Sequence, residues 1–308
     1  MAKEGRGVML NQPSYGSSYV IVTPVRDEAL YIAQTIESVL SQSKLPSAWI
    51  IVDDGSTDQT PEIVREQTNG VPWIRLLSTG NAQRQLGSAE VLAFNRGLAA
   101  ISADVRYDFV VKLDGDVRFG PTYFEQVIER MSSDPCWGIA SGVYSEERYG
   151  QWSSVQMPAY HAAGASKVIR RECLEAIGGF VSRKGWDTVD EIRAGMKGWK
   201  TGHFTDVEFQ HLKPEGMAMG PLRTHRFHGD IYYQTGGGVL FLLAKVGHRM
   251  FVARPLMIGG LAMLFGYIVP LLSHKARLVS EDEARFYRSM LNKRLTAPIS
   301  RLLTFFHL

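Results

Sequence analysis

Short apolar runs alternate with amphipathic stretches along roughly the first 130 residues of the chain. The runs are rich in β-branched and aromatic residues, as buried strands are, and they lie at Tyr19–Val22, Trp49–Val52, Trp73–Ser78 and Asp108–Leu113. Between the first two runs, apolar residues recur on one helical face, at Ala29, Ala33, Ile36, Val39 and Leu40. Asp27 is predicted to cap this first helix. The alternation predicts βαβ units, and so an α/β fold with helices on both faces of a mainly parallel sheet.

Polar residues gather where three of these runs end. The segments read "TPVRDE" after the first run, "DDGS" after the second and "DGD" after the fourth. The carboxyl ends of parallel strands lie at one edge of a sheet, where ligands bind. We therefore expect these three segments to meet around one site, although they are distant in sequence.

The last of these segments carries two carboxylates, Asp114 and Asp116, on either side of Gly115. The chain has no G-x-G-x-x-G after the first run and no G-x-x-x-x-G-K-[ST], so a glycine loop that cradles phosphate is not expected. A divalent metal that bridges carboxylates and phosphate oxygens is the other way to hold a diphosphate. The alternative interpretation is a solvated turn with capping aspartates.

Composition narrows the function only slightly. A formal net charge of +3 is too small to argue for a nucleic-acid partner. Two cysteines cannot build a disulfide framework, which favours a reducing compartment. The polar, glycine-rich residues 1–17 lack the apolar core of a signal peptide and are predicted to be a flexible lead.

After Tyr233, apolar stretches of the chain alternate with basic residues. Residues 255–272 are eighteen positions without a charge, flanked by basic residues on both sides. We interpret residues 233–308 as a membrane-associating helical region that lies in the cytoplasmic leaflet as one or two short helices, with a single span as the limiting case. The alternative is a helical hairpin buried against the preceding domain, residues 18–232.

Five blocks of the sequence resemble the family 2 glycosyltransferases. They read "VIVTPVRDEALYIAQTIESVLSQS", "WIIVDDGSTDQTPEIV", "VVKLDGD", "GASKVIRRECLEAIGGF" and "GWDTVDEIRAGMKGWKT", and they cover roughly residues 18–230. The resemblance implies the GT-A fold, a Rossmann-like nucleotide-diphospho-sugar transferase with a mixed, mainly parallel sheet flanked by helices; the apolar helical tail follows it.

The resemblance also implies roles for residues that contact the nucleotide. Thr23 and Val25 match nucleotide contacts, although many relatives have an aromatic residue and Asn where this chain has Val25 and Arg26. Glu28 matches either a nucleotide contact or a helix cap. Asp54 matches the residue that hydrogen-bonds the base, its alternative being an Asx turn. Arg84 matches a basic residue that reaches the base or a phosphate.

The remaining matches concern the metal and the base. Asp114 resembles the ribose or metal-water partner and Asp116 the direct ligand of Mg²⁺ or Mn²⁺, both of which accept hard oxygen ligands. Asp187 matches the base that activates the acceptor hydroxyl, and Asp190 is the second candidate; a helix cap is the competing role of Asp187. Apart from these matches, His228 is a candidate to reach the metal or the diphosphate. Arg223 and Arg226 are candidates to face the diphosphate, with solvated surface residues as the alternative.

These matches imply a metal-dependent, inverting glycosyltransferase that moves a sugar from a nucleotide-diphosphate donor to a hydroxyl acceptor. The tail favours a lipid-linked or polysaccharide acceptor at the cytoplasmic face of the cell membrane. Two alternatives stay open. One is a nucleotidyltransferase, which shares the sheet and the metal; the other is a non-catalytic membrane-bound binding module on the same fold.

Overall fold

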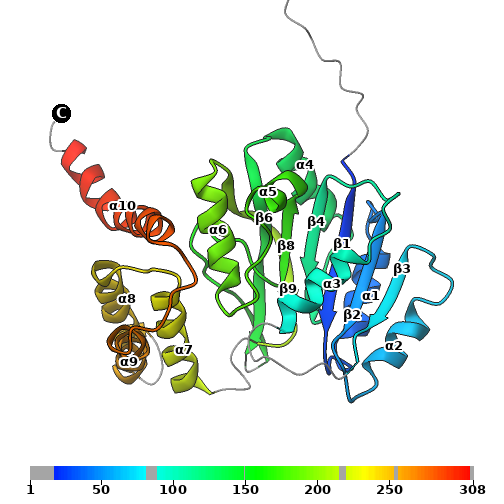
Figure 1. The fold of residues 1–308 in the computed structure, drawn as a ribbon, viewed down its shortest axis with the longest axis horizontal. Coiled ribbons are helices and arrows are strands. Elements are labelled where there is room, and N and C mark those ends of the chain that lie inside the picture. Colours follow the sequence, from blue (N-terminus) through cyan, green and yellow to red (C-terminus); the bar gives the residue numbers. More distant parts are fainter. Residues whose placement is uncertain (1–16, 81–88, 149, 215–219, 253–255, 306–308) are drawn as a thin grey trace, which may run out of the picture.

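The structure is a computed structural model that describes residues 17–80, 89–148, 150–214, 220–252 and 256–305 (Figure 1). Its centre is one sheet of nine strands. Four strands form a parallel half, in the spatial order β3 (Ile74–Ser78), β2 (Ala48–Asp53), β1 (Tyr19–Val25) and β4 (Phe109–Leu113). This half confirms the strands and the parallel pairing that the apolar runs predict.

The other half of the sheet is mixed. β8 (Ser166–Arg170) runs antiparallel to β4 and is followed by β6 (Trp137–Arg148), β9 (Lys200–His211) and β5 (Val117–Phe119). β6 and β9 are parallel, β9 and β5 are antiparallel, and β7 (Gln151–Ser154) pairs with β6 at the edge. The predicted α/β class with a mixed sheet is confirmed.

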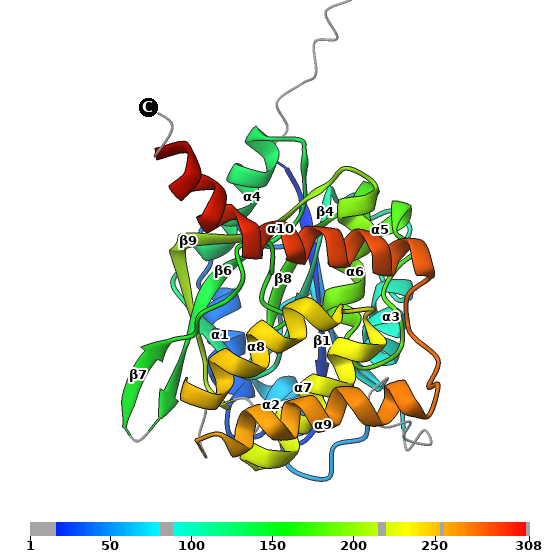
Figure 2. The ribbon, with the colours of Figure 1, turned by 90° about the vertical axis from the view of Figure 1, so that its left-hand side faces the viewer.

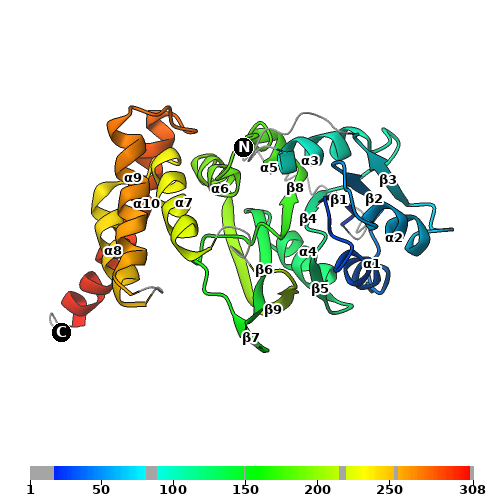
Figure 3. The ribbon, with the colours of Figure 1, turned by 90° about the horizontal axis from the view of Figure 1, so that it is seen from below.

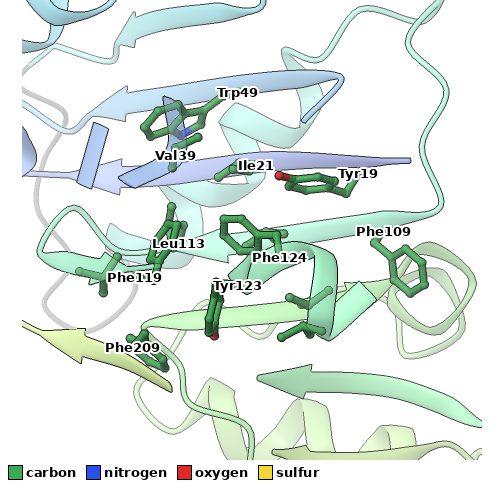
Figure 4. Packing of buried hydrophobic residues seen from close by; sticks show 14 of the residues in the cluster. Tyr19, Ile21, Val39, Trp49, Phe109, Leu113, Phe119, Tyr123, Phe124 and Phe209 are labelled. Carbon is green, nitrogen blue, oxygen red and sulfur yellow. The ribbon is translucent and has the colours of Figure 1, made fainter. Parts of the chain in front are cut away.

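Strand β1 sends alternate side chains into two cores, because successive residues of a strand point to opposite faces. On one face Tyr19 and Ile21 pack with Trp49 and with Phe124 of α4 (Tyr123–Ser133), as Figure 4 shows. The same face is covered by α1 (Ile32–Leu40) and α2 (Thr60–Gln67). Each fully buried apolar side chain contributes roughly 1.5–3 kcal/mol to this packing.

The second core lies on the opposite face of the sheet. Val20 and Val22 pack there with α3 (Ala89–Ala99), α5 (Arg171–Ala176) and α6 (Trp186–Met196). Helices therefore cover both faces, as the alternating pattern predicts.

The first helix begins later than predicted, because Asp27 does not cap it. α1 starts at Ile32, and Asp27 adopts a positive φ of 53°. The Asp27 Oδ1 atom accepts a hydrogen bond of 2.7 Å from the backbone N–H of Thr57. The carboxylate thus joins the segment after β1 to the segment after β2, and these two polar segments lie side by side.

The four last helices form a layer of their own beside α6 (Figures 1 and 3). They are α7 (Pro221–Gln234), α8 (Val239–Val252), α9 (Ile258–Leu272) and α10 (Glu281–Phe305). Val189 and Ile192 of α6 join this layer to the rest of the molecule through Tyr232, Leu242, Met263 and Tyr287. Among the helices that the structure describes, none is both long and apolar enough for a membrane crossing.

Helices α7 and α9 approach each other closely through two glycines. A Cβ at Gly229 would lie 2.0 Å from the carbonyl oxygen of Met263, and one at Gly266 would lie 2.0 Å from that of Arg226. Only glycine allows this contact. α7 crosses the predicted boundary between residues 232 and 233. The division of the chain into residues 1–17, 18–232 and 233–308 stays a prediction. All of the predicted lead but residue 17 lies outside the described residues.

Candidate active site

A cavity of about 930 Å³ lies at the carboxyl ends of β1, β2 and β4. The three polar segments meet there as predicted, through Val25 and Glu28, through Asp54, and through Asp114 and Asp116. Its other walls include the start of α6, the helical layer, the start of α3 and residues from the segment 155–165. This is the edge of an α/β sheet at which ligands bind.

Asp114, Asp116 and His211 form a cluster on the sheet side of this cavity. One ligand atom from each lies within 4.8 Å of the other two. The buried Asp116 Oδ1 atom has no hydrogen-bond partner among the described residues, and it lies 3.5 Å from His211 Nε2. Two carboxylates and an imidazole that converge with an unused buried oxygen fit a divalent cation.

His211 is held in place from its other ring nitrogen. Its Nδ1 atom lies 3.3 Å from the Glu146 carboxylate, a contact that orients the ring. Burial disfavours the imidazolium, but the carboxylates of Asp116 and Glu146 outweigh burial and raise the pKa of His211 to about 10. A metal that binds through Nε2 must therefore displace a proton.

A buried lysine anchors Asp114. The Lys112 side chain is 2% exposed and forms ion pairs with Asp114 and Glu90. Burial raises the pKa of Asp114 to about 6, although the Lys112 charge opposes this. Lys112 also lies 5.2 Å from the centre of the Trp186 ring, so the carboxylate is fixed through α6 as well as β4.

The two candidate bases on α6 occupy different environments. Asp187 lies in the first turn of the helix, as predicted, and lines the cavity. Asp190 is fully buried and does not line it. Its Oδ2 atom forms an ion pair of 2.9 Å with Lys167, which is equally buried. Only Asp187 can therefore meet a substrate directly in this conformation.

Asp190 belongs to a buried network that supports the start of α6. Lys167 also pairs with Glu191 at 3.4 Å and donates a hydrogen bond of 3.1 Å to the backbone carbonyl of Asp187. Burial raises the pKa of Asp190 to about 7. Burial acts on Glu191 in the same direction, but His161, Lys167 and the Ala162 amide hold the pKa of Glu191 below its usual range. The network fixes the backbone that carries Asp187.

The predicted nucleotide contacts are only partly brought together. Val25, Glu28 and Asp54 line the cavity. Thr23 does not, because it is fully buried and accepts a hydrogen bond of 2.8 Å from Trp49 Nε1 beneath the site. Arg84 lies outside the described residues.

The contacts of Glu28 and Asp54 orient both carboxylates. Glu28 pairs with Lys213 at 2.8 Å and caps no helix with its side chain; burial raises its pKa. Asp54 accepts a hydrogen bond of 3.1 Å from the Thr79 hydroxyl. The side chain that bonds the turn after β2 is that of the preceding residue, since Asp53 Oδ1 accepts a hydrogen bond from the amide of Ser56, three residues on.

Several residues of the site were not predicted from the sequence. His211 ends β9, where Val207 and Phe209 precede it on the same strand face. That period of two is a signal that would have directed the ring inward. From the helical layer the cavity receives Phe227, Tyr232, Lys245 and Tyr287 in addition to the candidate His228. Arg223 and Arg226 do not line it and lie between α7 and α9 instead.

The chain matches the sequence profile of a family described as "Glycosyl transferase family 2" over residues 20–181. Two curated relatives match a shorter stretch. The "Uncharacterized glycosyltransferase alr2836" of Nostoc sp. is 31% identical over 112 residues, which are 36% of this chain and 32% of that protein. The "Succinoglycan biosynthesis protein ExoA" of Rhizobium meliloti is 32% identical over 114 residues, 37% of this chain and 32% of that protein. The chain thus spans about a third of the length of these relatives.

Solved structures share the fold of this chain. The mannosyltransferase PcManGT from Pyrobaculum calidifontis, in complex with GDP-Man and Mn²⁺, has a TM-score of 0.56 at 18% identity. The similarity covers 95% of this chain and 91% of that one. Residues 1–349 of S. aureus TarS, in complex with UDP-GlcNAc, have a TM-score of 0.51 at 14% identity, over 87% and 78% of the two chains.

Proposed function

Because this chain belongs to glycosyl transferase family 2, we propose that it transfers a sugar from a nucleotide-diphosphate donor to a hydroxyl acceptor with the help of a divalent cation. One observation carries the proposal. The cluster of Asp114, Asp116 and His211 and the carboxylate of Asp187 line the same cavity. Sugar transfer needs these two functions in one place, since the leaving group and the attacking hydroxyl act on the same carbon.

The residues that hold the cation are Asp116, His211 and Asp114, and the ion is Mg²⁺ or Mn²⁺. A bound divalent cation supplies positive charge that stabilises the departing diphosphate. Lys112 and Glu146 hold Asp114 and His211 in position before any ligand arrives. Such preorganisation lowers the cost of forming charge in the transition state.

Asp187 is the general base of the proposed reaction. It accepts the proton of the acceptor hydroxyl while the acceptor oxygen forms a bond to the anomeric carbon. The bond from that carbon to the diphosphate oxygen breaks, and its electron pair leaves with the nucleoside diphosphate. A single displacement of this kind inverts the anomeric configuration. Asp187 lies in the first turn of α6, beside the positive end of the helix, where a negative charge is favourable.

The donor side of the cavity is the edge formed by β1 and β2. Asp54 can accept a hydrogen bond from a base N–H, and Val25 offers an apolar surface beside it. The complexes of PcManGT with GDP-Man and of TarS with UDP-GlcNAc support a nucleotide-sugar donor. A carboxylate accepts N–H groups of guanine, uracil and thymine alike, so the identity of the base is left to a panel of donors.

The helical wall of the cavity favours an acceptor that carries negative charge. Lys245 lies 5.3 Å from the centre of the Tyr232 ring, and no carboxylate of the described residues pairs with it. Burial lowers the pKa of Lys245 to about 8, an effect that a nearby anion would reverse. A lipid-linked saccharide contains phosphate beside its sugars and meets this requirement. The similarity to a succinoglycan biosynthesis protein supports a polysaccharide pathway.

Turnover with GDP-, UDP- and dTDP-sugars in the presence of Mn²⁺ tests the proposal. Wild-type protein should release nucleoside diphosphate and give a product of inverted anomeric configuration by NMR. Asp187→Asn should still bind donor but lose about 10²–10⁴-fold in transfer. Retained turnover in this variant, together with its loss in Asp190→Asn, would assign the base to Asp190. Release of pyrophosphate would indicate a nucleotidyltransferase, and equal inactivity of all proteins with every donor would indicate a binding module.

A further inference from the structure

Exposed apolar side chains concentrate on the outer side of the helical layer. Most of the large ones in the described residues lie between Val239 and Leu272, on α8 and α9. Figure 2 looks onto this side, where the two helices run next to each other. On α9, which carries no charged residue, Ile258, Leu261 and Phe265 are each about half exposed and Leu272 is 74% exposed. Apolar side chains grouped in this way are unfavourable on a surface that contacts only water. The apolar face therefore marks an interaction site.

A groove between α7 and α9 adds positive charge to this apolar face. It has a volume of about 380 Å³ and is lined by Leu222, Arg223 and Arg226 from α7 and by Ile258, Leu261, Ala262 and Phe265 from α9. The Arg226 guanidinium lies 5.0 Å from the centre of the Phe265 ring. In the part of the chain that the structure describes, neither arginine pairs with a carboxylate.

Other cations near the end of α9 differ from these two arginines. Lys275 forms an ion pair of 2.9 Å with Asp230, and Arg277 pairs with Glu281 at 3.3 Å. Their charge is compensated within the protein. The charge of Arg223 and Arg226 is not, so it is available to an external anion that sits beside an apolar phase.

We propose that the groove face, meaning the exposed residues of α9 together with Arg223 and Arg226, docks on an anionic phospholipid leaflet. The apolar side chains of α9 enter the acyl region, and the two guanidinium groups bind lipid phosphates. A second copy of the chain fits less well. In a two-fold dimer centred on the groove, these arginines would face the same arginines of the partner, and like charges would oppose association.

The same helix connects this face to the cavity. α7 presents Leu222, Arg223 and Arg226 to the groove and Phe227, His228 and Ile231 to the cavity. Docking would therefore hold the cavity next to the headgroup region, where the charged part of a lipid-linked acceptor lies. Only this last step rests on the proposed function; the docking itself does not.

Flotation of the full chain with vesicles tests the inference. Vesicles of phosphatidylcholine alone are compared with vesicles that contain phosphatidylglycerol. Wild type should float with the anionic vesicles and release them as salt rises. Leu261→Glu/Phe265→Glu should reduce binding at least tenfold. Arg223→Gln/Arg226→Gln should lose about fivefold per arginine on anionic vesicles only. Leu45→Glu, at an exposed leucine far along the chain from the groove face, should bind as wild type does.

Three results would overturn the inference. They are wild type that floats with neither vesicle, a Leu261→Glu/Phe265→Glu variant that floats as well as wild type, and a stable dimer in vesicle-free buffer that this variant dissociates. Circular dichroism and thermal unfolding exclude a folding defect in the variants. Donor hydrolysis in vesicle-free buffer should be the same in all of them. If hydrolysis is absent throughout but flotation persists, the proposed function fails and the docking surface stands.

Discussion

The parallel half of the sheet and the C-terminal helical layer line one cavity with opposite kinds of side chain. From the sheet come the carboxylates of Glu28, Asp54, Asp114 and Asp116. The helical layer contributes the aromatic rings of Phe227, Tyr232 and Tyr287 and the basic side chains of Lys245 and Arg249. The first set suits a metal and a nucleotide, whereas the second suits a saccharide and an anion. In the proposed function, the sheet side therefore serves the donor and the helical side binds the acceptor.

Different interactions stabilise the interior of each region. On the sheet side, the buried Lys112 pairs with Asp114, and the buried Lys167 pairs with Asp190 of α6. The helical layer relies on close backbone contact at Gly229 and Gly266 and on a cluster of tyrosines. Substitutions should therefore separate chemistry from acceptor binding and stability.

The largest effect is expected at Asp116. Asp116→Asn keeps the shape of the side chain but replaces its carboxylate by an amide. The Oδ1 atom of Asp116 accepts no hydrogen bond from the described residues. Mn²⁺ affinity should fall sharply and transfer should fall about 10³-fold, because leaving-group stabilisation is lost. Calorimetric titration with Mn²⁺ and a transfer assay measure both. Asp54→Asn is the matched control, which should keep Mn²⁺ affinity and weaken donor binding; unchanged Mn²⁺ affinity in Asp116→Asn would remove the metal from this cluster.

The next largest effect is expected in the buried network of Lys167, Asp190 and Glu191 beneath Asp187, and it concerns the stability of the protein. Lys167→Met leaves Asp190 and Glu191 buried without their shared cation, which should cost about 3–5 kcal/mol of unfolding free energy. Urea unfolding measures it. The double variant Lys167→Met/Asp190→Leu should recover part of this loss, because one buried charge is removed. A loss below about 1 kcal/mol in the single variant would show that water or rearrangement satisfies the carboxylates.

The sheet side of the cavity could be predicted from the sequence, whereas the helical side could not. Strands β1 to β4 are local apolar runs, so the positions of Asp54, Asp114 and Asp116 at their ends followed from pattern and topology. Asp187 followed from the resemblance. Thr23 does not line the cavity, because a strand residue can face the core instead of the site, and its hydroxyl accepts a hydrogen bond from Trp49.

The helical layer gave no comparable local signal for its part in the site. Tyr232, Lys245 and Tyr287 reach the cavity only because α7, α8 and α10 fold back beside α6. Such placement depends on contacts between helices that are distant in sequence. The close approach at Gly229 and Gly266, which sets the geometry of the layer, is visible only once both helices are in place.

The close approach of α7 and α9 predicts a smaller effect on stability. Glycine substitutions on α7 and α8 measure this effect. Gly229→Ala should destabilise the protein by about 1–3 kcal/mol, because its methyl group would collide with the Met263 carbonyl. Gly247→Ala on α8 is the control: nothing lies within 4 Å of its Cβ position, and it should stabilise by about 0.5–1 kcal/mol. Both are read from urea unfolding, with Mn²⁺ affinity expected to be unchanged. Equal effects of the two substitutions would mean that α7 and α9 do not touch as described.

The smallest effect concerns the His161–Glu191 pair, which is 3.0 Å long. Burial disfavours the imidazolium of His161, but the charge of Glu191 and its hydrogen bond outweigh burial and raise the pKa of His161 above 6.5. The pair therefore adds stability that is complete below pH 6.5 and is lost as the pH rises through the pKa of the folded protein. Asp190, with its pKa raised to about 7, acts in the same direction, so wild type alone does not isolate His161.

The His161→Gln variant isolates the contribution of His161 to the pH dependence of stability, because glutamine can still donate a hydrogen bond to Glu191 but does not titrate. The difference in unfolding free energy between wild type and this variant should be largest near pH 5.5 and should shrink toward pH 8.5. Thermal unfolding across this range measures it. A difference that grows with pH would mean that His161 is neutral in the folded protein, and the ion pair that links the cavity floor to α6 would then be a hydrogen bond between uncharged imidazole and Glu191.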